Sequence, residues 1–382
     1  MENLPNFREI CVKNYNDDEK LPRGLLYRSS RPDFLTDTEV CELQRLGIRS
    51  VLDFRSPKEY AKADGLKLLD GISALYTVKI PHREKYRPQE VVKCKLVTRK
   101  NKRQKKPLEA EVSSKDVKVE KVTDIKITGE SNDIQLKEVP NEDEVGSETE
   151  GSEVEEAEFN PDTSSMDKES LEKSQANSSS PPPIKHYLID FFTGRFIWSV
   201  FRRAPWYIQL YAFFWLLIDF ILRTGYLYFV QTFAKYVLNR NGILHQYMDI
   251  VDLSQRSICA ALKLLSDSEN IPALINCAHG KDRTGIVTAL VMHCLGKSRE
   301  EIAEEYSRSE AGLLPVKERL YKEMVGRYHF SEQFMTAEAA TMLKLLDYLS
   351  EKYGSVSNYL EYIGFSSIEQ ERLRRNLLCT DL

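Results

Sequence analysis

The chain has 382 residues, of which 42% are hydrophobic, so it is large and apolar enough to bury a substantial core, and its formal net charge of -4 argues against general nucleic-acid binding. The six histidines and seven cysteines are dispersed without the spacing of a zinc site or a redox motif, so we expect no metal, no cofactor and free thiols. The opening MENLPNFREI lacks the apolar stretch of a cleavable signal peptide, and with free thiols this predicts a reducing, cytoplasmic compartment.

Residues 1–92 have the pattern of the first part of an α/β domain. Thr36 and Glu39 form a capping box ahead of a helical stretch, and Gly47 stands where that helix would end. Apolar runs before and after this helix predict strands of a sheet that is covered on both faces, namely GLLYRSS, IRSVLDF and ALYTVKI. Strand, helix and strand in this order indicate an α/β fold with a central sheet flanked by helices.

Residues 93–183 differ sharply in composition. The segment begins with the basic run KCKLVTRKNKRQKK, continues through the acidic run NEDEVGSETEGSEVEEAE and ends with SQANSSSPPP, while aromatic residues almost vanish. Such a stretch buries too little apolar surface to offset the entropy of ordering, so we predict a disordered insertion within the domain. The basic run is interpreted as a solvated linker or, alternatively, as an attraction site for a membrane or partner.

Residues 184–238 are strongly aromatic, and three interpretations are open. The stretch from Trp206 to Leu222 is near the length of a membrane span, but Gln209 and Asp219 interrupt it. The pattern fits a hydrophobic helical lid over a functional site, a helix lying in a membrane interface, or a true span in which the carboxylate would be costly. Residues 206–238 are therefore a candidate for contact with a membrane surface.

Residues 239–382 predict helices around one buried strand. Apolar residues at helical spacing over 242–268 indicate one amphipathic helix, IPALINC indicates a buried strand, and RTGIVTALVMHCLG indicates a buried helix. Helices with serine or threonine caps and glycine stops follow from Ser298 onward. Three cysteines are predicted to be structural residues on apolar helix faces, namely Cys41, Cys259 and Cys294.

The junction between that buried strand and the buried helix carries residues that packing does not require. It reads NCAHGKDRTGIV over residues 276–287. A strand that enters a helix through a glycine-bearing loop turns several backbone N–H groups toward one point, and this arrangement binds an oxyanion such as phosphate. The same positive field favours the thiolate of Cys277, and Arg283 can hold two phosphate oxygens at once. A thiolate beneath a bound phosphate is arranged for nucleophilic attack on phosphorus.

This loop has the form C-x5-R-[ST] and resembles the signature of the protein tyrosine phosphatase superfamily. More narrowly, CAHGKDRTG is similar to the C-x-x-G-K-D-R-T-G loop of bacterial-type tyrosine phosphatases with dual protein and phosphoinositide specificity. The resemblance covers residues 1–90 and 240–382, including NFREI, GLLYRSSRPDFLTDTEVCELQRLGIRSVLDFRSPKEY and YGSVSNYLEYIGFSSIEQERLRRNLL. It implies a cysteine-phosphatase fold in which the aromatic residues lie where that family has a helical lid.

The resemblance also implies roles for the loop residues. Cys277 would be the nucleophile that takes the phosphoryl group, Arg283 the phosphate clamp, and Thr284 the donor that helps the thiolate to leave. The lysine of the loop is associated in that family with tolerance of phosphoinositide headgroups. The loop residues expected to bind the substrate are Ala278, His279, Gly280, Lys281 and Gly285.

Two aspartates compete as the acid that protonates the leaving oxygen. We favour Asp53, which matches an aspartate that the family places near the site at the end of a strand. Asp282 is then assigned to orienting water and shaping the loop. The alternative interpretation of Asp53 is an ordinary charge at a strand end, paired with Arg55.

Two functional hypotheses follow. The first is a cysteine-dependent phosphatase that hydrolyses phosphomonoesters of phosphotyrosine proteins, and of phosphoinositides, through a cysteinyl-phosphate. The second is a binding module with a phosphatase fold and little or no activity, which captures phosphorylated ligands at a membrane or partner. The intact thiol, arginine and threonine favour the enzyme, whereas Asn276, where the family has a histidine, keeps the binding module open.

Overall fold

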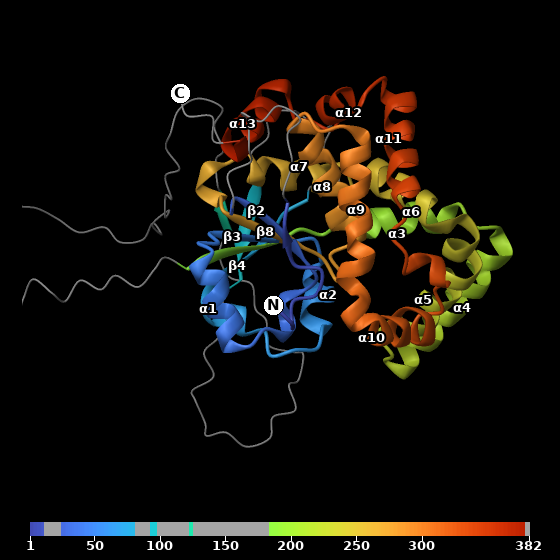
Figure 1. The fold of residues 1–382 in the computed structure, drawn as a ribbon. Coiled ribbons are helices and arrows are strands. Elements are labelled where there is room, and N and C mark those ends of the chain that lie inside the picture. The colour runs from blue at the N-terminus through green and yellow to red at the C-terminus, as the bar shows by residue number, and fades with distance from the viewer. Residues whose placement is uncertain (11–23, 81–91, 98–121, 125–182, 379–382) are drawn as a thin grey trace, which may run out of the picture.

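The computed structural model describes residues 1–10, 24–80, 92–97, 122–124 and 183–378, which form an α/β structure around one sheet (Figure 1). Within these residues the sheet has eight strands in the order β1-β2-β8-β3-β7-β4-β5-β6. The central strands from β2 to β4 run parallel to one another, and the remaining strands pair antiparallel at the two edges. The strands are β1 (Arg8–Glu9), β2 (Leu26–Ser29), β3 (Ser50–Asp53), β4 (Ser73–Val78), β5 (Lys93–Leu96), β6 (Val122–Asp124), β7 (Ile184–Leu188) and β8 (Ala273–Asn276).

Helices cover both faces of the sheet. In Figure 1, α1 lies on one side of the sheet, α7, α8 and α13 lie on the other, and α4 and α5 lie away from the sheet. The α-helices of the described residues are α1 (Asp37–Arg45), α2 (Pro57–Lys62), α3 (Gly194–Arg202), α4 (Trp206–Leu222), α5 (Leu227–Phe233), α6 (Asn239–Leu253), α7 (Gln255–Leu265), α8 (Asp282–Cys294), α9 (Arg299–Leu313), α10 (Lys317–Tyr321), α11 (Ala339–Tyr353), α12 (Val356–Tyr362) and α13 (Ser367–Leu378).

Side chains along the central strands alternate between the two faces of the sheet, and they form one core layer on each face. Val51 of β3 is paired with Leu274 of β8, and both side chains pack into the layer beneath α1. The next pair, Leu52 and Ile275, packs into the larger layer formed with the C-terminal helices. Successive side chains of a strand point to opposite faces, so a sheet buried on both sides requires this unbroken apolar run.

The register brings three strand ends to the same edge of the sheet. Asn276, the last residue of β8, is paired with Ser29 of β2 on one side and with Asp53 of β3 on the other. Since β8 lies between these two parallel strands, the loop that follows it emerges at the carboxyl edge. Binding sites of parallel α/β sheets form at that edge.

The predicted α/β fold class is confirmed, and the capping box of α1 is present, with Thr36 accepting from the Glu39 amide and Glu39 accepting from the Thr36 amide. One predicted helix is wrong in its extent. Residues 242–268 form parts of two helices, α6 and α7, that break at Ser254. At this break the Ser254 hydroxyl donates to the Phe191 carbonyl at 2.6 Å. The amphipathic pattern continues through Ser254, so it does not predict the break.

Two predicted boundaries also change. The aromatic stretch was expected to begin outside the sheet at residue 184, but residues 184–188 form β7 between β3 and β4. The expected insertion of residues 93–183 begins with β5 and contains β6, and its remaining stretches, 98–121 and 125–182, lie outside the described residues. Of the three cysteines expected on apolar faces, Cys41 is exposed, so that prediction is wrong for α1.

The residues from 194 to 238 form α3, α4, α5 and a π-helical turn, Ala234–Leu238. No helix in the described part of the chain is both long and apolar enough to cross a membrane. The interpretations of Trp206–Leu222 as a lid and as an interface helix stay predictions.

Candidate active site

The loop between β8 and α8 places Cys277 directly after the central strand. The thiol-bearing residue is 2% exposed, and α8 begins at Asp282. Gly280 has a φ of +65°, and a Cβ at this position would lie 2.1 Å from the Ser29 carbonyl oxygen. Only glycine therefore allows the loop to pass this close to the end of β2.

Hydrogen bonds from neighbouring elements hold the loop carbonyls outward. The Gly280 carbonyl accepts from Arg28 Nη2 at 2.6 Å and from Asn6 Nδ2 at 2.8 Å, and the Ala278 carbonyl accepts from the Arg31 amide at 3.3 Å. Arg28 is fixed in turn by Glu305 Oε2 at 2.6 Å. The amides of residues 278–281 make no hydrogen bond within the described part of the chain. Unengaged N–H groups at a helix N-terminus form a site for an oxyanion.

Arg283 is fixed from the opposite side of the loop. Its Nη1 donates to the Phe54 carbonyl at 2.8 Å and to Glu59 Oε2 at 2.9 Å, its Nη2 donates to Glu59 Oε1 at 2.8 Å, and its guanidinium carbon lies 4.7 Å from the centre of the Phe192 ring. Burial alone would lower the pKa of Arg283, but the Glu59 carboxylate outweighs burial and raises it. A guanidinium has five N–H donors, so these three bonds leave two for a ligand.

Sequence reasoning missed Glu59. The residue lies in the first turn of α2, whose N-cap Ser56 accepts from the Glu59 amide and whose first residue is Pro57. Serine followed by proline is a recognisable helix start, so the helix could have been predicted from the sequence. The partner of Glu59 lies 224 positions away, and no local pattern encodes that pairing.

Asp282 lies at the mouth of the loop in a hydrogen-bonded network. Its Oδ1 accepts from Lys281 Nζ at 2.6 Å and from the Tyr247 hydroxyl at 2.6 Å, and Tyr247 lies 2.7 Å from the Tyr306 hydroxyl. Burial favours the neutral carboxyl, but the Lys281 ammonium and these hydrogen bonds outweigh burial and lower the pKa of Asp282. The side chain is 24% exposed, so the carboxylate remains accessible to a ligand.

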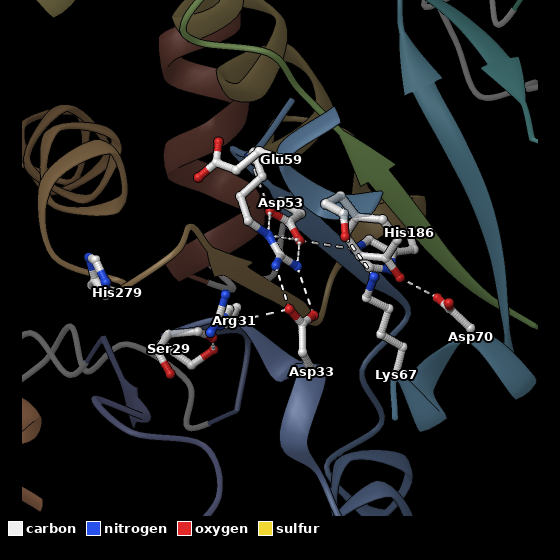
Figure 2. Close-up of polar contacts among 12 residues, drawn as sticks. Ser29, Arg31, Asp33, Asp53, Glu59, Lys67, Asp70, His186 and His279 are labelled. Atoms are coloured by element: carbon white, nitrogen blue, oxygen red, sulfur yellow. Dashed lines mark hydrogen bonds and ion pairs between the residues drawn. The ribbon is translucent and has the colours of Figure 1, made fainter. Parts of the chain in front are cut away.

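Asp53 lies in a buried ionic cluster. Arg55 donates to both Asp53 oxygens, with Nη2 at 2.6 Å from Oδ2, and to both Asp33 oxygens at 2.6 and 3.0 Å. Asp33 and Asp53 thus share one guanidinium, and Figure 2 shows His186 near Asp53, whose Oδ2 lies 3.5 Å from the His186 Nε2. Burial raises the pKa of Asp53, but Arg55 and His186 outweigh it and hold the pKa well below its usual range. The structure thus has the alternative arrangement, an Asp53–Arg55 pair, and a carboxylate held in this way is a poor proton donor.

The remaining predicted residues lie on or beside the loop. Thr284 Oγ1 and both polar atoms of the Asn276 side chain are buried without a hydrogen-bond partner among the described residues. His279 is partly exposed, and its Nε2 lies 3.9 Å from Glu323 Oε2. Gly285 sits in the first turn of α8, where a Cβ would lie 3.0 Å from the Tyr306 ring.

The central parallel strand β8 leads into the N-terminus of a helix, and the loop between them carries a buried thiol, backbone amides without partners among the described residues and a fixed arginine. This is the architecture of the cysteine-based phosphatases. The chain belongs to the tyrosine phosphatase family, whose model matches residues 1–127 and 231–379.

One curated relative is the "Triple specificity protein phosphatase PtpB" of Mycobacterium tuberculosis. It is 28% identical to the chain over 139 residues, which are 33% of this chain and 50% of the relative. The chain therefore matches about half the length of that protein. The family and this relative support a phosphatase function.

Proposed function

We propose that the protein is a cysteine-dependent phosphatase that hydrolyses phosphomonoesters through a cysteinyl-phosphate. The observation that carries the proposal is one loop in which the buried Cys277, the open amides of residues 278–281 and the doubly held Arg283 converge. In the first step the thiolate attacks phosphorus, an S–P bond forms, and the bond to the leaving oxygen breaks. In the second step water attacks phosphorus, the S–P bond breaks, and phosphate leaves. Thr284, whose hydroxyl has no other partner among the described residues, would donate to the departing sulfur.

Asp282 is the residue proposed to exchange the proton in both steps. Its carboxylate is partly exposed at the loop, whereas Asp53 is buried against Arg55. In the free protein Lys281 keeps Asp282 ionised, but a bound phosphate dianion would compete for that ammonium and raise the pKa of the carboxyl. The carboxyl can then protonate the leaving oxygen, and the resulting carboxylate can accept a proton from water.

Two arginines beside the loop favour substrates that carry a second phosphate. The guanidinium carbons of Arg31 and Arg319 lie 5.3 and 4.9 Å from the centre of the Phe34 ring. Burial and the positive charge of Arg31 lower the pKa of Arg319. A phosphate bound between Arg31 and Arg319 would relieve the repulsion between the two guanidinium groups. The neighbouring His279 imidazole lowers the pKa of Glu323 to about 2, so the Glu323 carboxylate supplies part of the negative charge beside the two arginines. Phosphoinositides with more than one phosphate are therefore proposed as substrates beside phosphotyrosine proteins.

The substrate proposal is tested by initial rates on p-nitrophenyl phosphate, a phosphotyrosine peptide, and soluble headgroups of mono- and bisphosphorylated phosphoinositides. We expect Arg31→Ala and Arg319→Ala each to lower kcat/KM for the bisphosphates about tenfold, the effect of losing one charge-assisted contact, and to leave p-nitrophenyl phosphate nearly unchanged. Equal losses on all substrates would contradict a second phosphate site. A lipid substrate also requires a membrane contact, for which residues 206–238 are the candidate.

A second candidate function, capture of phosphorylated ligands without turnover, is favoured by Asn276. Its side chain is a neutral amide that is buried beside Cys277 with neither polar atom hydrogen-bonded among the described residues, so it provides no positive charge near the thiolate. If this candidate holds, the wild-type protein will bind tungstate, an oxyanion analogue of phosphate, yet release no phosphate from any of the substrates above. Turnover that disappears in Cys277→Ser would exclude it.

A further inference from the structure

The surface formed by residues 194–240, here called the α3–α5 surface, is unusually apolar for a part of the chain that faces solvent. Among the described residues, fourteen of the nineteen exposed large hydrophobic side chains lie on it. Phe220 is 80% exposed and Trp206 is 72% exposed. In α4 only Ala212 and Asp219 are buried. An apolar surface of this extent marks a site of interaction.

The composition of the surface matches the boundary between lipid and water. All three tryptophans of the chain, Trp198, Trp206 and Trp215, belong to it, and Trp198 and Trp206 are exposed. Exposed tyrosines stand among them at Tyr207 and Tyr211, with others further along the surface. Tryptophan and tyrosine favour the headgroup level of a bilayer because one end of each ring system is apolar and the other is polar.

The charge of the surface has one sign. Residues 194–240 contain six basic residues and a single acidic residue, in a chain whose net charge is -4. All six basic residues are exposed, and one of them, Arg203, is paired with Asp249 of α6. The six are Arg195, Arg202, Arg203, Arg223, Lys235 and Arg240.

The single carboxylate of this surface is used inside it. Asp219 is 2% exposed and accepts hydrogen bonds from the Thr224 hydroxyl and from the amides of Tyr228 at 3.1 Å and Phe229 at 2.7 Å. It thereby satisfies the first amides of α5 and fixes the turn between α4 and α5. Asp219, the carboxylate that would be costly inside a membrane span, is thus a cap for the start of α5. Because it is buried, it places no carboxylate on the exposed face.

We propose that the α3–α5 surface docks on an anionic lipid bilayer, with its aromatic side chains in the headgroup region and its basic residues on lipid phosphates or carboxylates. The sign of the charge selects this partner, because a second copy of the chain would bring like charges together across a symmetric interface. No described helix crosses a membrane, so the contact is peripheral.

The α3–α5 surface begins two residues after Phe192, which contacts Arg283 of the candidate active site. Phe192, whose ring packs on Arg283, is followed by Thr193, the N-cap of α3. α3 and α4 fall outside the two ranges that match the tyrosine phosphatase family. Docking would bring this face of the enzyme to the lipid without using any residue of the loop.

The test uses the full-length protein and vesicles of phosphatidylcholine alone or with phosphatidylserine. Since every tryptophan lies on the α3–α5 surface, selectively excited tryptophan fluorescence reports on that surface alone. We expect the protein to sediment with the anionic vesicles, its emission to shift to the blue, and binding to weaken with added salt. The double variants Phe220→Ser with Ile221→Ser, and Arg202→Glu with Arg223→Glu, should each bind at least tenfold more weakly.

Matched controls lie elsewhere on the surface of the molecule. Ile368→Ser removes an apolar side chain that is 73% exposed, and Lys344→Glu reverses an exposed charge on α11. Both should bind like the wild type, and all variants should keep wild-type turnover of p-nitrophenyl phosphate if the enzyme is active. Absence of vesicle binding, equal binding by all variants, or self-association without vesicle binding would each overturn the proposal. Binding is measured without turnover, so its outcome is independent of the phosphatase proposal.

Discussion

Asp53 and Asp282 show how two carboxylates near one loop come to differ in chemistry. Asp53 is 0% exposed and shares Arg55 with Asp33, which fixes its charge and its orientation. Asp282 is held by Lys281, a residue that a phosphate can recruit. The sequence places both aspartates at the site and offers Arg55 as a partner of Asp53, but it carries no signal for Asp33, which shares that arginine. The hydrogen bonds from Arg55 to Asp53 argue for Asp282 as the acid, and the role of each aspartate stays a prediction.

A leaving-group comparison separates the two aspartates. We expect Asp282→Asn to lower kcat/KM, which reports the first step, about 10²- to 10³-fold for an alkyl phosphate, whose oxygen needs a proton, and far less for p-nitrophenyl phosphate, whose oxygen leaves readily. The alkaline limb of the kcat/KM profile should also disappear for the alkyl substrate. Asp53→Asn should instead lower the melting temperature and affect both substrates alike. If Asp53→Asn shows the leaving-group dependence, the assignment is reversed.

At the scale of elements, the strand, loop and helix that carry the thiol were predictable. The apolar run of β8 and the helical run of α8 are continuous in the sequence, and glycine marks the loop between them. The start of α9 was predictable too, because Ser298 and Glu301 form a capping box, which the structure contains. Contacts between elements were not predictable. The hydrogen bonds of Arg283 to Glu59 and of Arg28 to the Gly280 carbonyl each join residues more than 200 positions apart.

Gly280 tests how tightly the loop is fitted to β2. In Gly280→Ala the new Cβ would lie 2.1 Å from the Ser29 carbonyl, so the loop must move and the amides lose their convergence. We expect turnover to fall by at least a hundredfold, a loss of the size seen when oxyanion donors are removed. Gly296→Ala is the matched control, since Gly296 also has a positive φ, +79°, with nothing within 4 Å of the added Cβ.

The control should lose about 1–2 kcal/mol of unfolding free energy, the cost of a left-handed backbone, and keep its activity. Similar activity in Gly280→Ala and Gly296→Ala would show that the approach to Ser29 does not shape the site.

At the scale of the whole molecule, buried carboxylates tie distant segments together. Glu305 of α9 binds Arg8 of β1 at 2.8 Å and Arg28 of β2 at 2.6 Å. Burial favours its neutral form, but the two arginines outweigh burial and lower its pKa. A carboxyl whose pKa is lower in the folded state stabilises above its unfolded pKa, about 4.3 for glutamate, and this contribution is lost as the pH falls.

Two neighbouring glutamates offer a direct comparison of this effect. Glu305→Gln should cost about 3–5 kcal/mol of unfolding free energy at pH 7, since it leaves buried arginines unpaired, and should flatten the loss of stability below about pH 4.5. Glu304→Gln removes a carboxylate whose side chain is 68% exposed, and should change the free energy by less than about 0.5 kcal/mol. Urea unfolding between pH 3 and 7 measures both. Equal effects of the two changes would contradict a stabilising role for the buried cluster.

The central claim is that Cys277 carries the phosphoryl group between the two steps. The direct measurement is rapid quenching of the Asp282→Asn variant in alkaline denaturant during turnover of p-nitrophenyl phosphate, because the S–P bond is labile in acid, followed by mass spectrometry of its peptides. Loss of the group that activates water should slow the second step, so the peptide that contains Cys277 should gain the mass of one phosphoryl group. The same peptide from the Cys277→Ser variant should stay unmodified. Turnover without a phosphorylated Cys277 peptide, or with the label on another residue, would contradict the account.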